Sequence, residues 1–189
     1  MRQLRLASSR TSPPPLGSRN RASHPSLEAF ESEFDYIVRT LRRLGVARDD
    51  VEDLAHEVFL VLYRTWDKYD STRPFRPYVF GIAFRVAANH VRKRSREVTQ
   101  SVVEVEDLQP GPERLLETAK ARALILNALE RVPLRRRAVL VMHDIDQLKM
   151  GEIAESLSIY RFTGYSRLRK ARKEFASAIT SLLRGAYRP

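Results

Sequence analysis

The stretch MGEIAESLSIYRFTGYSRLRKARKEF, Met150–Phe175, decides how the C-terminal part of this chain folds. Its apolar residues follow the three-and-four spacing of two helices joined by a short turn. The residues that face inward in this pattern are Ile153, Ala154, Leu157, Leu168, Ala171 and Phe175. A helix-turn-helix uses this arrangement to place its second helix in the major groove, with a cationic flank on phosphates. The pattern is only moderately specific, because any three-helix bundle with a basic surface helix mimics it.

A second basic amphipathic segment, PYVFGIAFRVAANHVRKRSRE, spans Pro77–Glu97. The 189 residues carry a formal net charge of +11, and the sequence pI is about 10.4. Two cationic surfaces on one small chain are suited to an extended polyanion, and we expect that polyanion to be nucleic acid. The absence of cysteine excludes a disulfide, a thiol nucleophile and a cysteine-based zinc site. No apolar run approaches the roughly 20 residues that span a bilayer, so we expect a soluble, cytoplasmic protein without membrane insertion.

Helical periodicity accounts for almost the whole chain, and no strand-like alternation competes with it. The pattern starts at Ser26 and continues to Leu44, where Gly45 is placed to end a helix. Asp49 or Asp50 is suited to cap the next helix. We therefore predict an all-α protein made of two small helical domains and a flexible acidic linker. The expected boundaries are a disordered basic arm at 1–25, a first domain at 26–97, the linker at 98–117 and a helix-turn-helix domain at 118–189.

Three segments resemble the extracytoplasmic-function group of bacterial sigma factors, in the order that this family has them. VEDLAHEVFLVLYRTWDKYD, Val51–Asp70, is similar to the helix that docks on core RNA polymerase. RPFRPYVFGIAFRVAANHVRKRSRE, Arg73–Glu97, is similar to the stretch that melts and reads the minus-ten element. EIAESLSIYRFTGYSRLRKAR, Glu152–Arg172, is similar to the stretch that reads the minus-thirty-five element. The resemblance implies two domains with these three roles and no catalytic chemistry.

Candidate site residues follow from the resemblance, residue by residue. For core polymerase they are Asp53, Leu54, Glu57 and Val61. For the minus-ten element they are Lys68, Tyr69, Ser71, Thr72, Arg73, Tyr78, Arg85, Asn89, Arg92, Lys93 and Arg96. For the minus-thirty-five element they are Arg161, Phe162, Thr163, Ser166, Arg167 and Lys170. Polar and aromatic groups in the loop before Tyr78 are suited to hold an extruded base, and Asn89 can pair with adenine.

Four residues of the second domain depart from the family pattern. Ser158 stands at a turn position that favours positive φ, and Lys149 stands where a Ser or Thr usually caps the helix. Gly164 replaces an apolar residue on the buried face, and Phe162 replaces a small one. The first three changes each cost about 1 kcal/mol. We therefore expect a marginally stable second domain with a weakened or re-angled recognition helix.

Signals for other chemistry are weak. His56 and Glu57 begin like an HExxH zinc motif, but Leu60 stands where the second histidine would be needed. No phosphate-binding glycine loop or nucleophile–base arrangement is recognisable, so we expect no enzyme, metal or cofactor. The partners that the resemblance implies are core RNA polymerase, promoter DNA and an inhibitory anti-sigma factor. Two alternatives stay open: a DNA-binding regulator that is not a polymerase subunit, and a sigma-like decoy that no longer reads promoters.

Overall fold

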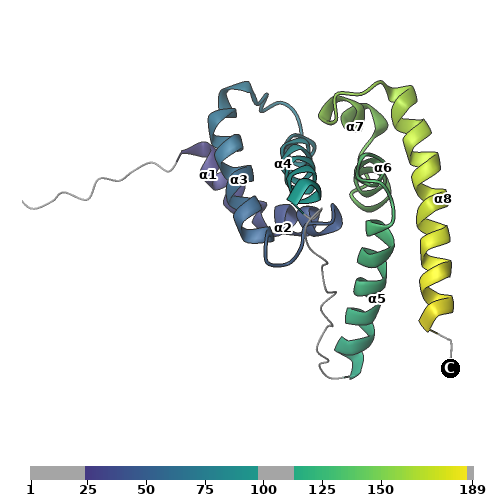
Figure 1. Ribbon diagram of the computed structural model, residues 1–189. Coiled ribbons are helices and arrows are strands. Elements are labelled where there is room, and N and C mark those ends of the chain that lie inside the picture. Colours follow the sequence, from purple (N-terminus) through teal and green to yellow (C-terminus); the bar gives the residue numbers. More distant parts are fainter. Residues whose placement is uncertain (1–23, 98–112, 187–189) are drawn as a thin grey trace, which may run out of the picture.

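The computed structural model describes residues 24–97 and 113–186, and every element in these ranges is helical (Figure 1). The expectations for the basic arm and for most of the linker lie outside the described residues. Within the described part, no helix has the length and apolar character required to cross a bilayer. The prediction of an all-α protein with two helical domains is confirmed.

The first lobe contains α1 (Pro25–Ser32), α2 (Phe34–Arg43), α3 (Val51–Arg64), the 3₁₀ turn η1 (Trp66–Lys68) and α4 (Phe75–Glu97). Its core contains the fully buried side chains of Ile37, Leu41, Val58, Leu62 and Ile82. The single helix expected from Ser26 to Leu44 is instead divided at Glu33, whose φ of −113° is not helical. Gly45 has a φ of +89°, so its predicted role as the residue that ends α2 is confirmed.

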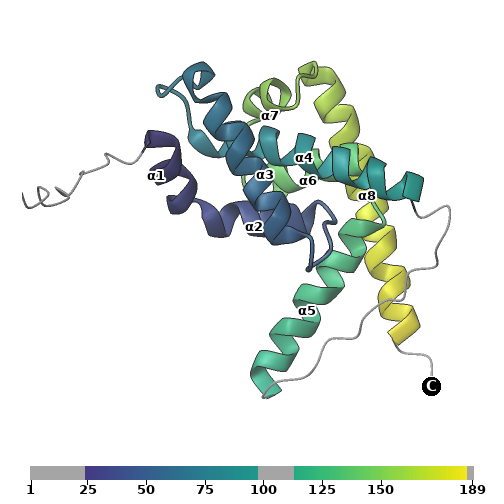
Figure 2. The ribbon, with the colours of Figure 1, turned by 60° about the vertical axis from the view of Figure 1, so that its left-hand side comes forward.

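The second lobe contains α5 (Glu113–Glu130), α6 (Leu134–Leu140), the π-helical turn η3 (Val141–Ile145), α7 (Met150–Ser156) and α8 (Arg161–Ala186). Helix α5 begins inside the segment that we expected to be linker, so the linker boundary at residue 117 is wrong. Helix α6 continues directly into the wider turn of η3. Figure 2 shows α5 and the C-terminal half of α8 extending beyond the rest of the molecule.

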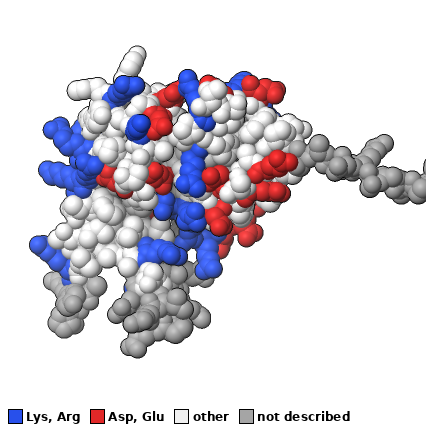
Figure 3. All heavy atoms as spheres, turned by 180° about the vertical axis from the view of Figure 1, so that it is seen from behind, with Lys and Arg blue, Asp and Glu red and all other residues white. Residues whose placement is uncertain are grey.

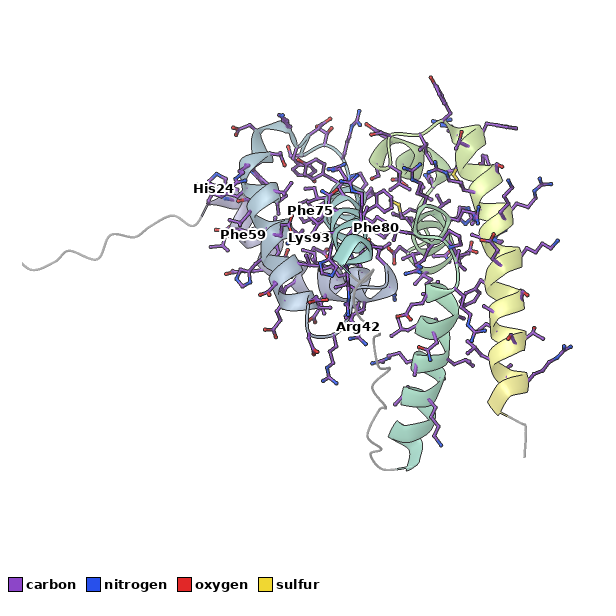
Figure 4. All side chains as sticks on the ribbon, viewed as in Figure 1. His24, Arg42, Phe59, Phe75, Phe80 and Lys93 are labelled. Carbon is purple, nitrogen blue, oxygen red and sulfur yellow. The ribbon has the colours of Figure 1, made fainter. Side chains whose placement is uncertain are left out.

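The two lobes pack directly against each other, with α4 against α7 and α2 against α5, and they share one apolar core. Phe80, which is fully buried, lies on the side of α4 that faces the second lobe (Figure 4). The buried guanidinium of Arg137 donates to the Leu44 carbonyl of the first lobe at 2.7 Å. It also donates to the carbonyls of Val132 at 3.1 Å and Glu130 at 2.6 Å in its own lobe. These three carbonyl acceptors compensate the buried guanidinium of Arg137 for the water that it loses on folding.

The helix-turn-helix accommodates most of its unusual residues. Ser158 has the predicted positive φ, at 51°. Lys149 is the N-cap of α7 without a side-chain acceptor of its own, but the Glu152 carboxylate accepts the Lys149 N–H at 2.9 Å. Gly164 is buried on the inner face of α8, where the Met150 thioether occupies the space that a side chain would fill. The expectation that Gly164 loses apolar contacts is therefore wrong, because Met150 supplies them from the facing helix.

Candidate nucleic-acid and polymerase interface

An aromatic cluster supports the loop that precedes α4. The ring of Tyr69 lies 5.4 Å from Trp66, 5.4 Å from Phe75 and 5.0 Å from Tyr78, between centroids. The Tyr78 hydroxyl donates to the Thr65 carbonyl at 2.9 Å, and the Tyr69 hydroxyl donates to the Arg73 carbonyl at 2.7 Å. These bonds fix both ends of the loop and leave the faces of the two tyrosines half-buried.

The tip of this loop is polar and exposed. The Asp70 carboxylate accepts the backbone N–H of Thr72 at 3.0 Å and its hydroxyl at 2.6 Å. These hydrogen bonds, with the charge of Arg73, hold the pKa of Asp70 below its ordinary value. Lys68, Ser71, Thr72 and Arg73 are exposed, as expected for a nucleic-acid surface. Arg73 pairs with Asp70 at 3.2 Å and also with Glu155 of the second lobe.

The outer face of α4 continues this surface. Arg85, Asn89, Arg92 and Lys93 are all exposed, and Figure 4 shows Lys93 near the C-terminal end of the helix. Arg92 Nη2 donates to the Asn89 amide oxygen at 3.0 Å, so the residue predicted to read a base is paired with one predicted to bind phosphate. The side chain of Arg96 lies outside the described residues.

The recognition helix α8 presents a mixed face. Arg161, Phe162 and Lys170 are exposed, whereas Thr163, Ser166 and Arg167 are half-buried at the edge of a hollow of about 690 Å³. Asn89 and Arg92 of α4 line the same hollow, so residues assigned to two different DNA elements meet around one space. The hollow also contains residues that the sequence analysis missed, Arg135 and Arg136 of α6. The run of three arginines at 135–137 was a signal for them.

Two exposed tyrosines beside the predicted Phe162 were missed. Tyr160, immediately before α8, is 86% exposed, and Tyr165 of α8 is 58% exposed; Phe162 itself is 85% exposed. Arg169 is exposed one turn after Tyr165. Their positions follow from the helix period once Gly164, Leu168 and Ala171 are known to be buried. The helix therefore offers aromatic as well as cationic groups to a ligand.

The candidate polymerase surface lies on α3. Asp53 and Glu57 are exposed on one face and Val61 is half-buried. Leu54 is only 6% exposed and belongs to the core, so its assignment to this surface is wrong. Two residues that the assignment omitted, Leu60 and Tyr63, are 49% and 51% exposed. Phe59 and His24 lie nearby, on the side of the first lobe turned away from the second (Figure 4).

Acids and apolar side chains together make a surface suited to a protein partner rather than to DNA. Among the described residues, no three His, Cys, Asp or Glu side chains lie together as metal ligands would.

Comparison with known proteins identifies the family. Residues 29–97 match Sigma-70 region 2, and residues 122–175 match Sigma-70, region 4. The chain belongs to the sigma-70 family. These matches include α3, the aromatic loop, α4 and most of α8, in the order that the sequence motifs predicted. This chain carries region 2 as well as the helix-turn-helix of region 4. A DNA-binding regulator that is not a polymerase subunit has no use for region 2, so we set that alternative aside.

Curated relatives place this sigma factor in the extracytoplasmic-function group. It is 26% identical over 155 residues to RNA polymerase sigma factor NccH of Alcaligenes xylosoxydans xylosoxydans, covering 77% of this chain and 81% of that one. It is 25% identical over 162 residues to the ECF RNA polymerase sigma-E factor of Escherichia coli K12, covering 80% and 85%.

Two solved structures share the fold. The sigma factor RpoE of Bartonella quintana, crystallised with the anti-sigma factor NepR, matches with a TM-score of 0.59 and 20% identity, over 81% of this chain and 98% of that one. CnrH, solved with the cytosolic domain of CnrY, matches with a TM-score of 0.57 and 18% identity, over 82% and 88%.

Proposed function

We propose that this sigma factor binds core RNA polymerase in the bacterial cytoplasm through α3 and delivers it to promoters through two DNA-reading surfaces. The observation that carries the proposal is the match to regions 2 and 4 on the two lobes, each with its cationic surface. The chain itself performs no bond chemistry, and the enzyme is the polymerase that it directs. The proposed polymerase contacts are Asp53, Glu57, Leu60, Val61 and Tyr63.

Recognition of the minus-ten element is assigned to the aromatic loop and α4. An unpaired base extruded from the duplex would stack against Tyr69 or Tyr78, and the polar loop tip would hold its edge. Arg85, Arg92 and Lys93 would bind phosphates of the same strand, which supplies affinity without sequence information. Asn89 would read an adenine with two hydrogen bonds. Capture of the extruded base stabilises the melted state and thereby favours opening.

Recognition of the minus-thirty-five element is assigned to the first two turns of α8. Phe162 and the neighbouring exposed tyrosines are suited to contact thymine methyl groups, and Arg161, Arg167 and Lys170 to contact phosphates or guanine. Because α8 carries aromatic side chains at its exposed N-terminal end, we expect a preference for A·T-rich upstream sequence. A selection of bound sequences from a random duplex pool checks this preference.

An anti-sigma factor is the third proposed partner, because both structural neighbours were solved with one or with a cytosolic partner domain. A groove of about 1060 Å³ between α2, α5 and α8 supports this partner. Its lining includes the apolar side chains of Val38, Ile125, Leu129 and Phe175 and the cations Arg39, Arg42, Arg43, Arg122 and Arg172. Arg43 and Arg172 are already paired with Asp146 and Asp144, so Arg39, Arg42 and Arg122 carry the argument for an acidic partner. Lys and Arg also form a band down the middle of the face seen in Figure 3, with acidic side chains beside it. This chemistry fits an amphipathic helix whose apolar stripe is edged by Asp and Glu.

Co-elution tests the polymerase part of the proposal. The purified chain is mixed with bacterial core polymerase and separated by size, with the variant Leu60→Ala/Tyr63→Ala and the variant Leu183→Ala run in parallel. Leu183 is a 46% exposed leucine near the end of α8, so its substitution controls for the loss of an exposed leucine at a remote site. We expect the wild type and Leu183→Ala to co-elute with core and the α3 variant to separate from it. Separation of the wild-type chain from core would overturn the assignment.

The anti-sigma part needs a separate test. The partner that co-purifies with the chain from its own cells is identified, produced and titrated against wild type, Ile125→Glu and Arg42→Glu. Ile125 is 44% exposed, so its replacement does not open a cavity in the core. We expect each variant to weaken binding at least about tenfold, or about 1.4 kcal/mol. Equal affinities for all three proteins would place the partner elsewhere.

A further inference from the structure

The hollow of about 690 Å³ between α4, α6 and α8 is lined by cations, and no Asp or Glu stands among the described residues that line it. Its cations come from all three helices: Arg92, Arg135, Arg167 and Lys170. Two other hollows of the surface differ in this respect. The groove between α2, α5 and α8 contains Asp144, and the hollow beside the aromatic loop contains Glu152 and Glu155. In those two places the chain supplies negative charge of its own.

The cations of this hollow also lack acidic partners elsewhere. Arg136, a fifth cation in the lining, is balanced by two bonds to the Glu174 carboxylate, at 2.9 and 2.8 Å. Within the described ranges no acid pairs in this way with Arg135, Arg167 or Lys170. Burial and the like charge of Arg135 hold the pKa of Arg167 below its ordinary value. A bound anion would relieve that repulsion, so the hollow has an electrostatic need that the described chain does not meet.

Uncharged groups of the lining add hydrogen-bonding and stacking capacity. The half-buried hydroxyls of Thr163 and Ser166 lie one turn apart on α8, and neither makes a hydrogen bond within the part of the chain that the structure describes. The Asn89 amide oxygen is occupied by Arg92, which leaves the amide N–H groups free to donate outward. The ring of Phe162 is 85% exposed and borders the same space, so it offers a free aromatic face.

We propose that this hollow binds a nucleotide carrying at least two phosphates. Charge-assisted bonds from the guanidinium and ammonium groups would hold the phosphates, with the two hydroxyls as further donors. The base would stack on Phe162, and the Asn89 amide would meet its edge. The volume lies within the range of about 300–1000 Å³ that is usual for small-ligand sites. The alternative source of phosphate, promoter DNA, fits less well, because the residues of α4 and of α8 are assigned to two separate promoter elements.

Two consequences follow for the ligand. Mg²⁺ is usually held through carboxylates, and none is present in the described lining, so the nucleotide should bind without the metal. Asn89, Arg92, Arg167 and Lys170 also belong to the DNA assignments above. A bound nucleotide and promoter DNA therefore exclude each other at these side chains, which would couple promoter binding to the nucleotide supply.

Isothermal titration calorimetry of the free chain, in EDTA and about 150 mM salt, is the first test. ATP, GTP, tripolyphosphate and adenosine are titrated separately. We expect ATP or GTP to bind with a Kd below about 100 μM and tripolyphosphate to bind at least about tenfold more weakly, because it has no ring to stack. Adenosine lacks the phosphates and should not bind. Weaker binding of both nucleotides, or equal affinity for either fragment, would overturn the proposal.

Two variants test the two halves of the site. Arg135 is exposed and has no part in the DNA assignments, and Arg135→Glu should weaken ATP and tripolyphosphate alike, at least about tenfold. Phe162→Ala should weaken ATP at least about fivefold and leave tripolyphosphate unchanged. Arg184→Glu, at an exposed arginine near the end of α8, makes the same change of net charge and should bind as wild type does. Unchanged ATP affinity in the first two variants, or an equal loss in Arg184→Glu, would contradict the site.

Photolabelling with 8-azido-ATP locates the nucleotide without any substitution. The label should appear in the peptides that contain Phe84 or Phe162, both in the lining, and unlabelled ATP should displace it. Label confined to other peptides would overturn the location. Neither experiment includes polymerase or DNA. A failed nucleotide site therefore leaves the sigma assignment intact, and a failed sigma assignment does not alter the outcome of these titrations.

Discussion

The thioether of Met150 lies against the Cα of Gly164, in the space that a side chain at position 164 would fill. The core of the helix-turn-helix therefore stays packed, because the long side chain of Met150 on α7 fills the space left by the missing side chain of Gly164 on α8. Met150 and Gly164 share one space in the core, so the effect of a substitution at one position on stability should depend on the residue at the other.

Gly164→Val should cost about 1–3 kcal/mol of folding stability because it overpacks against Met150. Met150→Ala should cost about 2–5 kcal/mol because it opens a cavity. The double variant should be more stable than the sum of the two changes predicts, by at least about 1 kcal/mol. Urea unfolding of the four proteins measures the coupling. Strict additivity would mean that the two residues do not share the space.

Arg92→Ala and Asn89→Ala should have different effects on DNA binding. Loss of a phosphate contact at Arg92 should weaken binding evenly across promoters and reduce the salt slope by about 1. Loss of a base contact at Asn89 should relax the preference at one position of the minus-ten element. Arg184→Ala, at an exposed arginine near the end of α8, is the control for lost charge. If Asn89→Ala lowered all promoters equally, its base-reading role would be wrong.

Asp144 gives the second lobe a defined pH dependence. Arg172 donates to its carboxylate at 2.8 and 2.6 Å, and these bonds, with His143, hold the pKa of Asp144 below its ordinary value. A carboxyl with a depressed folded pKa contributes stability that is present above its unfolded pKa of about 4. That contribution is lost as the pH falls through the folded pKa. Asp144→Asn should therefore be less stable than wild type at pH 7, with the difference shrinking below about pH 4. Urea midpoints from pH 7 to 3 measure it, and a pH-independent difference would contradict the account.

The sequence predicted best what depends on local geometry. Gly45 and Ser158 adopt positive φ as their positions required, because turn conformation follows from a few neighbouring residues. The inward faces of α3 and α8 also follow from the helix period. The sequence could not reveal a change of helix where the apolar periodicity continues through it. The break at Glu33 and the wide turn at Val141–Ile145 both lie in such stretches.

Contacts between distant segments were beyond the sequence. Leu54 shares a motif with Asp53, but the side chain points into the core, so a family pattern alone assigned it to the wrong surface. Met150 and Gly164 compensate each other only once α7 and α8 are in place. The docking of α7 on α4 joins Glu155 to Arg73 across 82 residues, and neither the charge pattern nor the helix period indicates it.

The central claim, that this chain is a sigma factor that directs initiation, is tested most directly by run-off transcription. Purified bacterial core polymerase is supplied with a pool of genomic fragments, with and without the protein, and the transcripts are sequenced. The account predicts transcripts that start at defined sites only when the protein is present, preceded by a shared minus-ten sequence. A protein that co-elutes with core but yields no such transcripts would be a promoter-blind decoy, and that result would contradict the account.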